Sequence, residues 1–202
     1  MFGTSLRPEA SLGGTLDVEA LAARIPTSYT VKGLFVSRFV ERLGAADYTK
    51  LEPRLAGAPR GGRYLPFKDY LQADYTRIVA AAAGKQFSSL PLPEAVRRIA
   101  REDFSTFGAS MFGKIVLSVI GDARSTLHRA PEAYHRIAPG PHVTVEDIDA
   151  RVTRLTFTGH RGSLEYTLGQ LEGIVLAHHR IPTVIVQRVS ADTLAFDVRH
   201  GG

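Results

Sequence analysis

The sequence contains no cysteine and no tryptophan, and only two methionines. The absence of cysteine excludes disulfide bonds, thiolate metal ligands and a cysteine nucleophile. No run of apolar residues approaches the roughly 18 needed to span a bilayer, and residues 1–7 lack the basic start and apolar run of a secretory signal. We therefore expect a cytoplasmic protein without a membrane span.

The charge balance is mildly basic. The 202 residues include 25 Lys or Arg and 20 Asp or Glu, which gives a formal net charge of +5. A nucleic-acid-binding protein usually concentrates its positive charge on one face or tail, whereas here the arginines are scattered among acidic residues. We do not expect nucleic acid as a partner. That alternative would require a contiguous arginine face and a steep salt dependence.

The last quarter of the chain is the most informative region. Residues 151–158 alternate polar and apolar side chains, as a half-buried strand does, and a glycine-containing turn interrupts this pattern. Residues 163–179 carry apolar side chains at helical spacing, and residues 183–189 and 193–198 have the composition of two further strands. The pattern predicts a β-α-β-β unit.

Helical patterns dominate the preceding residues. Residues 31–43 repeat apolar side chains every three or four positions. Residues 67–83 predict a second helix that Gly84 ends, and Pro93 suits the first turn of a third. We therefore predict an α+β fold, in which an N-terminal helical layer packs on a small, mainly antiparallel C-terminal sheet that ends in β-α-β-β.

The length and the even composition favour one domain that spans residues 1–202, with no linker or repeat. The glycine-containing residues 1–14 are expected to form a loosely ordered N-terminal segment. Immediately before the terminal unit, residues 142–145 predict a short strand and residues 146–149 a polar turn.

Three short motifs occur in a characteristic order. They are Val31-Lys-Gly-Leu-Phe35, Pro93-Glu-Ala-Val-Arg-Arg-Ile99 leading into residues 108–113, and Leu168-Gly-Gln-Leu-Glu-Gly-Ile174. Together they resemble an uncharacterised paralogous family that is abundant in myxobacteria. The resemblance covers residues 31–198, most of the chain.

The terminal unit resembles, more distantly, the vinyl-reductase-like domains, the TRAPP tethering subunits and the haem nitric-oxide-binding domains. This resemblance implies a glycine-containing helix against a four-stranded sheet, and either an apolar pocket between helices and sheet or a dimer formed through the helices. The haem-binding relatives need a proximal histidine and a Tyr-x-Ser-x-Arg motif. His128 and His135 lie in a plausible helical region, but the motif is absent. The zinc-holding relatives need cysteines, so we expect no cofactor.

An aromatic segment is the candidate for an apolar ligand pocket. It contains Phe104, Phe107, Met111 and Phe112. The alternative interpretation is ordinary core packing, because a pocket and a core have the same composition and only a cavity measurement separates them.

The turn between the predicted strand and helix is a candidate anion site. It consists of His160, Arg161, Gly162 and Ser163. Free backbone N–H groups at a helix N-terminus favour anions, and the arginine adds positive charge. The alternative is a tight turn in which the serine caps the helix, since no phosphate-loop pattern is present.

Catalytic and metal signatures are missing from the sequence. Ser110 does not lie in a Gly-x-Ser-x-Gly elbow, and Asp69 and Asp74 are predicted to lie solvated on one helix. His178 and His179 are adjacent in a helix and so point about 100° apart, which disfavours a shared metal. We expect neither a catalytic residue nor a metal ligand.

The first hypothesis is therefore a non-enzymatic cytoplasmic binding module in bacterial signalling, which senses a small apolar or amphipathic ligand or scaffolds a protein partner. The alternative is a homodimeric TRAPP-like interaction protein. A further alternative is an enzyme of unknown class, which a buried cluster of titratable residues in a cleft would support.

Overall fold

The structure is a computed structural model that describes residues 5–6, 15–109 and 121–201. Its elements, in chain order, are β1 (Ser5–Leu6), α1 (Val18–Ala23), β2 (Thr30–Lys32), α2 (Gly33–Leu43), α3 (Ala45–Leu51), two 3₁₀ turns η1 (Glu52–Arg54) and η2 (Arg60–Gly62), β3 (Asp69–Leu71), α4 (Gln72–Gln86), α5 (Leu92–Ala109), α7 (Ala123–His128), α8 (Ala130–Ile137), β4 (His142–Asp149), β5 (Val152–Thr158), α9 (Leu164–Ala177), β6 (Thr183–Arg188) and β7 (Thr193–Arg199).

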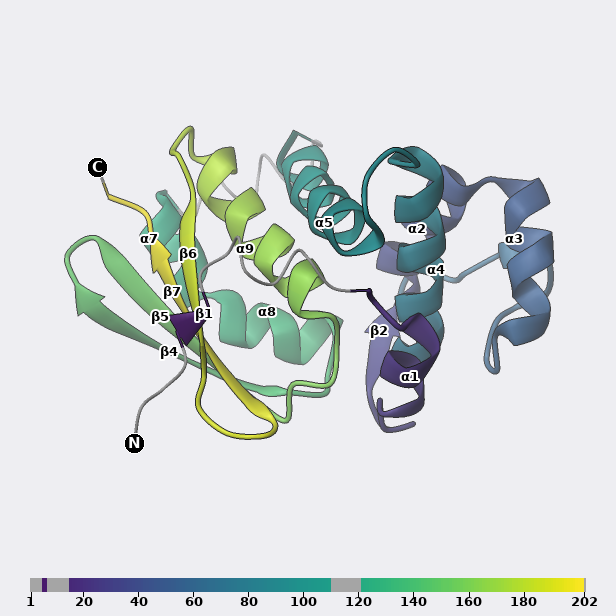
Figure 1. Cartoon of the computed structure of the whole chain (residues 1–202), viewed down its shortest axis with the longest axis horizontal. Helices are drawn as coiled ribbons and strands as arrows, with labels where there is room; N and C mark the ends of the chain where they lie inside the picture. Colours follow the sequence, from purple (N-terminus) through teal and green to yellow (C-terminus); the bar gives the residue numbers. More distant parts are fainter. Residues whose placement is uncertain (1–4, 7–14, 110–120, 202) are drawn as a thin grey trace.

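The elements form two halves that lie side by side (Figure 1). The helical half contains α1 to α5, and the sheet half contains α7, α8, α9 and a five-stranded sheet. Each half has its own cluster of buried apolar residues. This arrangement confirms the predicted α+β fold, with helices first and a small antiparallel sheet last.

The helical half packs α2, α4 and α5 together around side chains that have no exposed surface, including Phe39, Ile78 and Ile99. The amphipathic pattern of α2 explains its position, because one face of the helix is apolar. Two predicted helix starts are wrong, since β2 and β3 pair antiparallel, with Val31 opposite Tyr70. Gly84 does not end α4, which continues to Gln86.

The two aspartates that the sequence suggested were solvated differ in environment. Asp69 is on the exposed edge of β3 and lies 2.8 Å from the Lys32 ammonium nitrogen. Asp74 is only 2% exposed. Its carboxylate accepts hydrogen bonds from the backbone N–H groups of Ala56 at 3.1 Å and Gly57 at 2.7 Å. The prediction is therefore wrong for Asp74, which organises a loop.

The main sheet has the strand order β1-β6-β7-β5-β4 with antiparallel pairing throughout. The predicted terminal β-α-β-β unit is confirmed, with β7 between β5 and β6. Residues 146–149 do not form a turn, because they extend β4 and Glu146 lies opposite Arg154. β1 was not predicted. Residues 1–4 and 7–14 lie outside the described residues, and the expectation of a loosely ordered N-terminal segment falls on them.

Helices α7, α8 and α9 cover one face of the sheet, as α9 does in yellow-green over the strands in Figure 1. The alternation of β5 places Leu155 and Phe157 on this face, where they are 0% and 1% exposed. The opposite face is polar, and Arg154 binds the carboxylate of Asp197 there with two nitrogen–oxygen contacts of 2.6 and 2.9 Å.

Helices α5 and α9 lie side by side where the two halves meet (Figure 1). Glycine makes this close approach possible. A Cβ atom on Gly169 would lie 2.1 Å from the backbone oxygen of Arg97, and one on Gly173 would lie 2.7 Å from the Cβ of Phe104. The buried carboxylate of Glu172 accepts hydrogen bonds from Arg97 Nε at 3.1 Å. The joint is therefore both tight and ionic.

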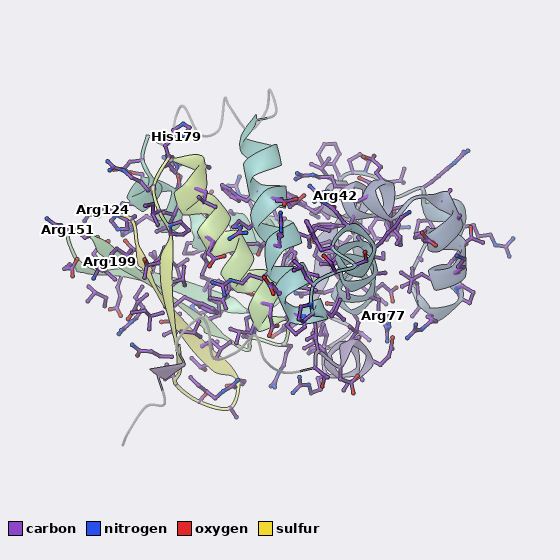
Figure 2. The ribbon with its side chains drawn as sticks, turned by 45° about the horizontal axis from the view of Figure 1, so that its top comes forward. Arg42, Arg77, Arg124, Arg151, His179 and Arg199 are labelled. Carbon is purple, nitrogen blue, oxygen red and sulfur yellow. The ribbon has the colours of Figure 1, made fainter. Side chains whose placement is uncertain are left out.

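Charged side chains occur on both halves. Figure 2 shows Arg42 and Arg77 on the helical half, and Arg124, Arg151 and Arg199 at the far end of the sheet half. Among the residues that the structure describes, no helix is long and apolar enough to cross a membrane.

Candidate functional site

A cavity of about 390 Å³ lies between the helical half and the sheet half. Val31, Phe35 and Val79 line it from the helical half, and Tyr134 and Phe157 line it from the sheet half. The volume falls in the range of roughly 300–1,000 Å³ that is typical of small-molecule sites. The joint between the halves is thus close-packed at α5 and α9 and hollow beside them.

Two residues that line the cavity near the start of α8 are exposed. Arg129 immediately precedes this helix and Ala133 lies in its first turns. The buried Ala130 lies between them. The lining of the cavity therefore includes side chains that solvent reaches as well as buried ones.

Two pairs of side chains supply hydrogen-bonding groups to the apolar wall. The hydroxyl oxygens of Tyr75 and Tyr166 lie 2.5 Å apart, and the Tyr134 hydroxyl donates to Gln170 Oε1 at 2.8 Å. Burial raises the pKa of Tyr75, Tyr134 and Tyr166 above the ordinary value of a phenol. All three tyrosines therefore stay neutral at physiological pH.

A buried ion pair lies at the edge of the cavity. Arg38 Nη2 is 2.9 Å from Asp103 Oδ1, and both residues line the cavity. Arg42 is a second, more distant cation at 3.7 Å. Burial raises the pKa of Asp103, while the charges of Arg38 and Arg42 act in the opposite direction.

Gln72 is the first residue of α4 and also lines the cavity. Its Oε1 atom is buried and has no hydrogen-bond partner among the described residues. An unsatisfied buried acceptor costs about 1–3 kcal/mol, so a donor on a bound molecule or a water would stabilise this arrangement.

The four residues of the predicted anion site, His160, Arg161, Gly162 and Ser163, all line the cavity, and they also border a smaller hollow of about 200 Å³. Ser163 caps α9, as the alternative interpretation expected, because its Oγ accepts from the Tyr166 N–H at 3.2 Å. Arg161 lies 3.5 Å from Asp192. The structure brings the four residues to a cavity, and anion binding by them stays a prediction.

His160 is a partly buried imidazole that is neutral at physiological pH. Burial lowers its pKa to about 4, with a smaller contribution from the Arg188 charge. Its Nε2 lies 3.0 Å from Thr167 Oγ1, and its ring packs against Phe157 and Phe196 with centroids 5.9 and 6.3 Å apart. The imidazole thus anchors the turn before α9 to the sheet core.

The predicted apolar pocket is described only in part. Phe104 lines the cavity, and Phe107 lies in α5. Met111 and Phe112 lie outside the described residues. The sequence interpretation did not single out Tyr75 or Tyr166. Both tyrosines lie on apolar faces of helices, which could have indicated a cavity wall. The same pattern is found for tyrosines that pack in a core, so the sequence does not separate the two.

Comparison with known proteins identifies both family and fold. Residues 24–200 match the model of a family described as a protein of unknown function (DUF2378). A search of curated protein sequences found no significant match. The H-NOX protein of K. algicida in the Fe(II) unliganded state has a TM-score of 0.63 at 14% identity, covering 85% of this chain and 97% of that chain.

The H-NOX protein of S. oneidensis in the Fe(II)NO ligation state is also similar, with a TM-score of 0.59 at 15% identity, covering 85% of this chain and 99% of that chain. At such identities the likeness shows the fold alone. The shared fold agrees with the distant resemblance to haem nitric-oxide-binding domains that the terminal β-α-β-β unit indicated.

The described residues do not fit a haem group. Haem iron requires an axial donor, most often histidine, that is directed at the metal. Of the seven histidines, all of which are described, His160 alone lines the cavity, and its Nε2 is bonded to Thr167. His128 lies 3.0 Å from Asp147, and His135 is exposed. The described residues also contain no cluster of three or more His, Asp or Glu side chains that suits a metal ion.

Proposed function

The chain belongs to the DUF2378 family, and from that premise we propose that it is a non-enzymatic binding module whose cavity takes a small apolar or amphipathic ligand. The observation that carries this proposal is the cavity of about 390 Å³ with walls from both halves. A ligand there would contact both halves at once, and a molecule that binds one arrangement of the halves better shifts the population toward it. This is the property that a sensor in bacterial signalling requires.

The polar groups of the cavity favour binding rather than catalysis. Tyr75 pairs with Tyr166, and Tyr134 donates to Gln170. Each of these hydroxyls therefore has a structural partner, and their raised pKa values disfavour a phenolate nucleophile or base. The unpartnered Oε1 of Gln72 would instead accept a hydrogen bond from a ligand hydroxyl or N–H.

The structural neighbours support the proposal by analogy of fold. The H-NOX proteins of K. algicida and S. oneidensis hold Fe(II), and the latter also NO. Because the described residues place no histidine at the cavity other than His160, whose Nε2 is bonded to Thr167, we propose that the chain uses the same architecture for an organic ligand. Fold analogy by itself does not assign a function, so the proposal depends on the cavity.

Two alanines on α4 provide a matched test. Ala80 lines the cavity and is 7% exposed, whereas Ala82 is fully buried in the helical core and is not among the cavity residues. Ala80→Leu should fill the cavity and weaken binding of the uncharged fluorescent probe N-phenyl-1-naphthylamine at least tenfold, with little loss of stability. Ala82→Leu should cost about 2 kcal/mol of stability and leave probe affinity unchanged below its melting temperature.

Fluorescence titration measures the affinity, and thermal unfolding measures the stability. If Ala80→Leu binds the probe as tightly as the wild type does, the probe lies outside the cavity and the proposal is contradicted. A wild type that does not bind the probe at all would contradict it as well.

A surface on the helical half favours the second candidate, a homodimeric scaffold. Leu34, Leu65 and Phe67 are 41%, 62% and 86% exposed. They lie close together, because the Leu34 N–H donates to the backbone oxygen of Pro66. Exposed apolar patches often mark contact surfaces. We expect Phe67→Ser to convert a dimer to a monomer in light scattering if this candidate is correct, and a wild-type monomer at all concentrations would remove it.

A further inference from the structure

The charged groups of the cavity wall are unequal in sign. The described lining contains three arginines, Arg38, Arg129 and Arg161, but Asp103 is its one carboxylate. Asp103 lies against Arg38 at 2.9 Å. Arg161 lies 3.5 Å from Asp192, which is outside the lining of this cavity. An excess of positive charge therefore remains at the cavity.

Arg129 is the source of this excess. It forms no ion pair or side-chain hydrogen bond with any residue that the structure describes, unlike the other two arginines. It is exposed, lies just before α8 and lines the cavity. An exposed guanidinium that lines an apolar cavity and has no partner among the described residues is suited to hold an anionic group while the interior holds an apolar body.

We infer that the ligand is an anionic amphiphile, such as a medium-chain carboxylate, whose head group binds Arg129 and whose apolar tail enters the cavity between Val79 and Phe157. This inference rests on the proposed function and adds the sign of the ligand's charge. Burial of the apolar tail would supply affinity. The anionic head group would pair with Arg129, which has no acidic partner among the residues that the structure describes.

The test compares three ten-carbon molecules that carry an anionic, a neutral and a cationic head group. Decanoate, 1-decanol and decylammonium are titrated at pH 8 to displace N-phenyl-1-naphthylamine from the wild-type protein. Decanoate should displace the probe at about a fivefold lower concentration than 1-decanol, since an exposed ion pair contributes modestly, and decylammonium should be the weakest.

Matched variants locate the effect. Arg129→Gln should remove the advantage of decanoate and leave displacement by 1-decanol unchanged. Arg136→Gln serves as the control, because Arg136 is exposed on α8, the helix that Arg129 precedes, pairs with Glu132 at 2.7 Å and does not line the cavity. It should leave all three molecules unchanged.

The outcomes separate this inference from the proposed function. If 1-decanol displaces the probe as well as decanoate does, or if Arg129→Gln leaves the preference intact, the anionic ligand is overturned and the binding module stands. If neither the probe nor any of the three molecules binds, both are overturned.

Discussion

The boundary between the two halves contains two regions of opposite character. At α5 and α9 the backbones are so close that a Cβ atom on Gly169 would overlap the Arg97 backbone oxygen. Beside this contact, the same boundary encloses a cavity of about 390 Å³. A closely packed contact is destabilised when even one methyl group is added, whereas a cavity has room for additional atoms. The comparison indicates that the joint fixes the halves together and that the cavity leaves the space that the proposed ligand would occupy.

The largest effect is expected at the ion pair of the joint. Glu172 is 4% exposed, and its carboxylate is bound by Arg97. Glu172→Ala should lower the free energy of unfolding by about 4 kcal/mol, because it removes the carboxylate that a largely buried guanidinium binds. Chemical denaturation measures this change. Glu132→Ala breaks an exposed pair with Arg136 and should have no measurable effect; equal effects of the two substitutions would contradict a special role of the joint.

A methyl group added to the joint should have the next largest effect. Gly169→Ala is expected to cost about 3 kcal/mol, since the clash is with backbone rather than a flexible side chain. Gly84→Ala is the matched control. Gly84 lies inside α4, and its added Cβ would lie at an ordinary contact distance of 3.7 Å from Leu92 Cδ1. The substitution should therefore stabilise the protein by about 0.5–1 kcal/mol. Thermal and denaturant unfolding of both variants check this, and a harmless Gly169→Ala would mean that the helices are not closely packed.

The turn beside the cavity should make stability depend on pH. The pKa of His160 is lowered to about 4 by burial, so the unfolded chain binds its proton more tightly than the folded chain does. The stabilisation is complete above about pH 6.5 and is lost as the pH falls toward 4. Between pH 7 and pH 5 we expect a loss of about 2 kcal/mol from this group.

His160→Phe should flatten the pH dependence over that range, as measured by denaturant unfolding at several pH values. His178 and His200 also have pKa values lowered by burial and give both proteins a remaining slope of the same sign. The raised pKa of Asp103 acts in the opposite direction. An unchanged slope in His160→Phe would show that folding does not lower the pKa of the imidazole.

The smallest effect is expected for the tyrosine pair of the cavity wall. Tyr75→Phe removes the 2.5 Å contact with Tyr166 and should cost about 1 kcal/mol, because the remaining hydroxyl loses its partner. The double variant Tyr75→Phe with Tyr166→Phe should cost less than the sum of the two single variants. Strict additivity in unfolding experiments would indicate that the two hydroxyls do not interact.

The sheet half was largely predictable from the sequence. Alternation in β5 and the apolar spacing in α9 are local patterns that match burial on one face, and the structure confirms both. The cap of α7 was predictable too, since Asp122 accepts from the Ser125 N–H at 2.7 Å. β2 and β3 were missed because each has three residues and they pair across 37 or more positions of chain.

The sequence could not decide between a ligand cavity and ordinary core packing. Aromatic residues such as Phe104 have the same sequence pattern whether they line a cavity or fill a core. The buried role of Asp74 depends on the backbone of Ala56 and Gly57, which the fold brings to it. Likewise, the lack of an acidic partner for Arg129 among the described residues depends on which side chains lie near it in space, and spacing along the chain carries no such information.

A crystal structure of the protein with N-phenyl-1-naphthylamine would test the central claim most directly. We predict density for the probe between the halves, in contact with Tyr75 on one side and Phe157 on the other, with α5 and α9 unmoved. A structure in which side chains fill that space and the probe lies only on the outer surface would contradict the account.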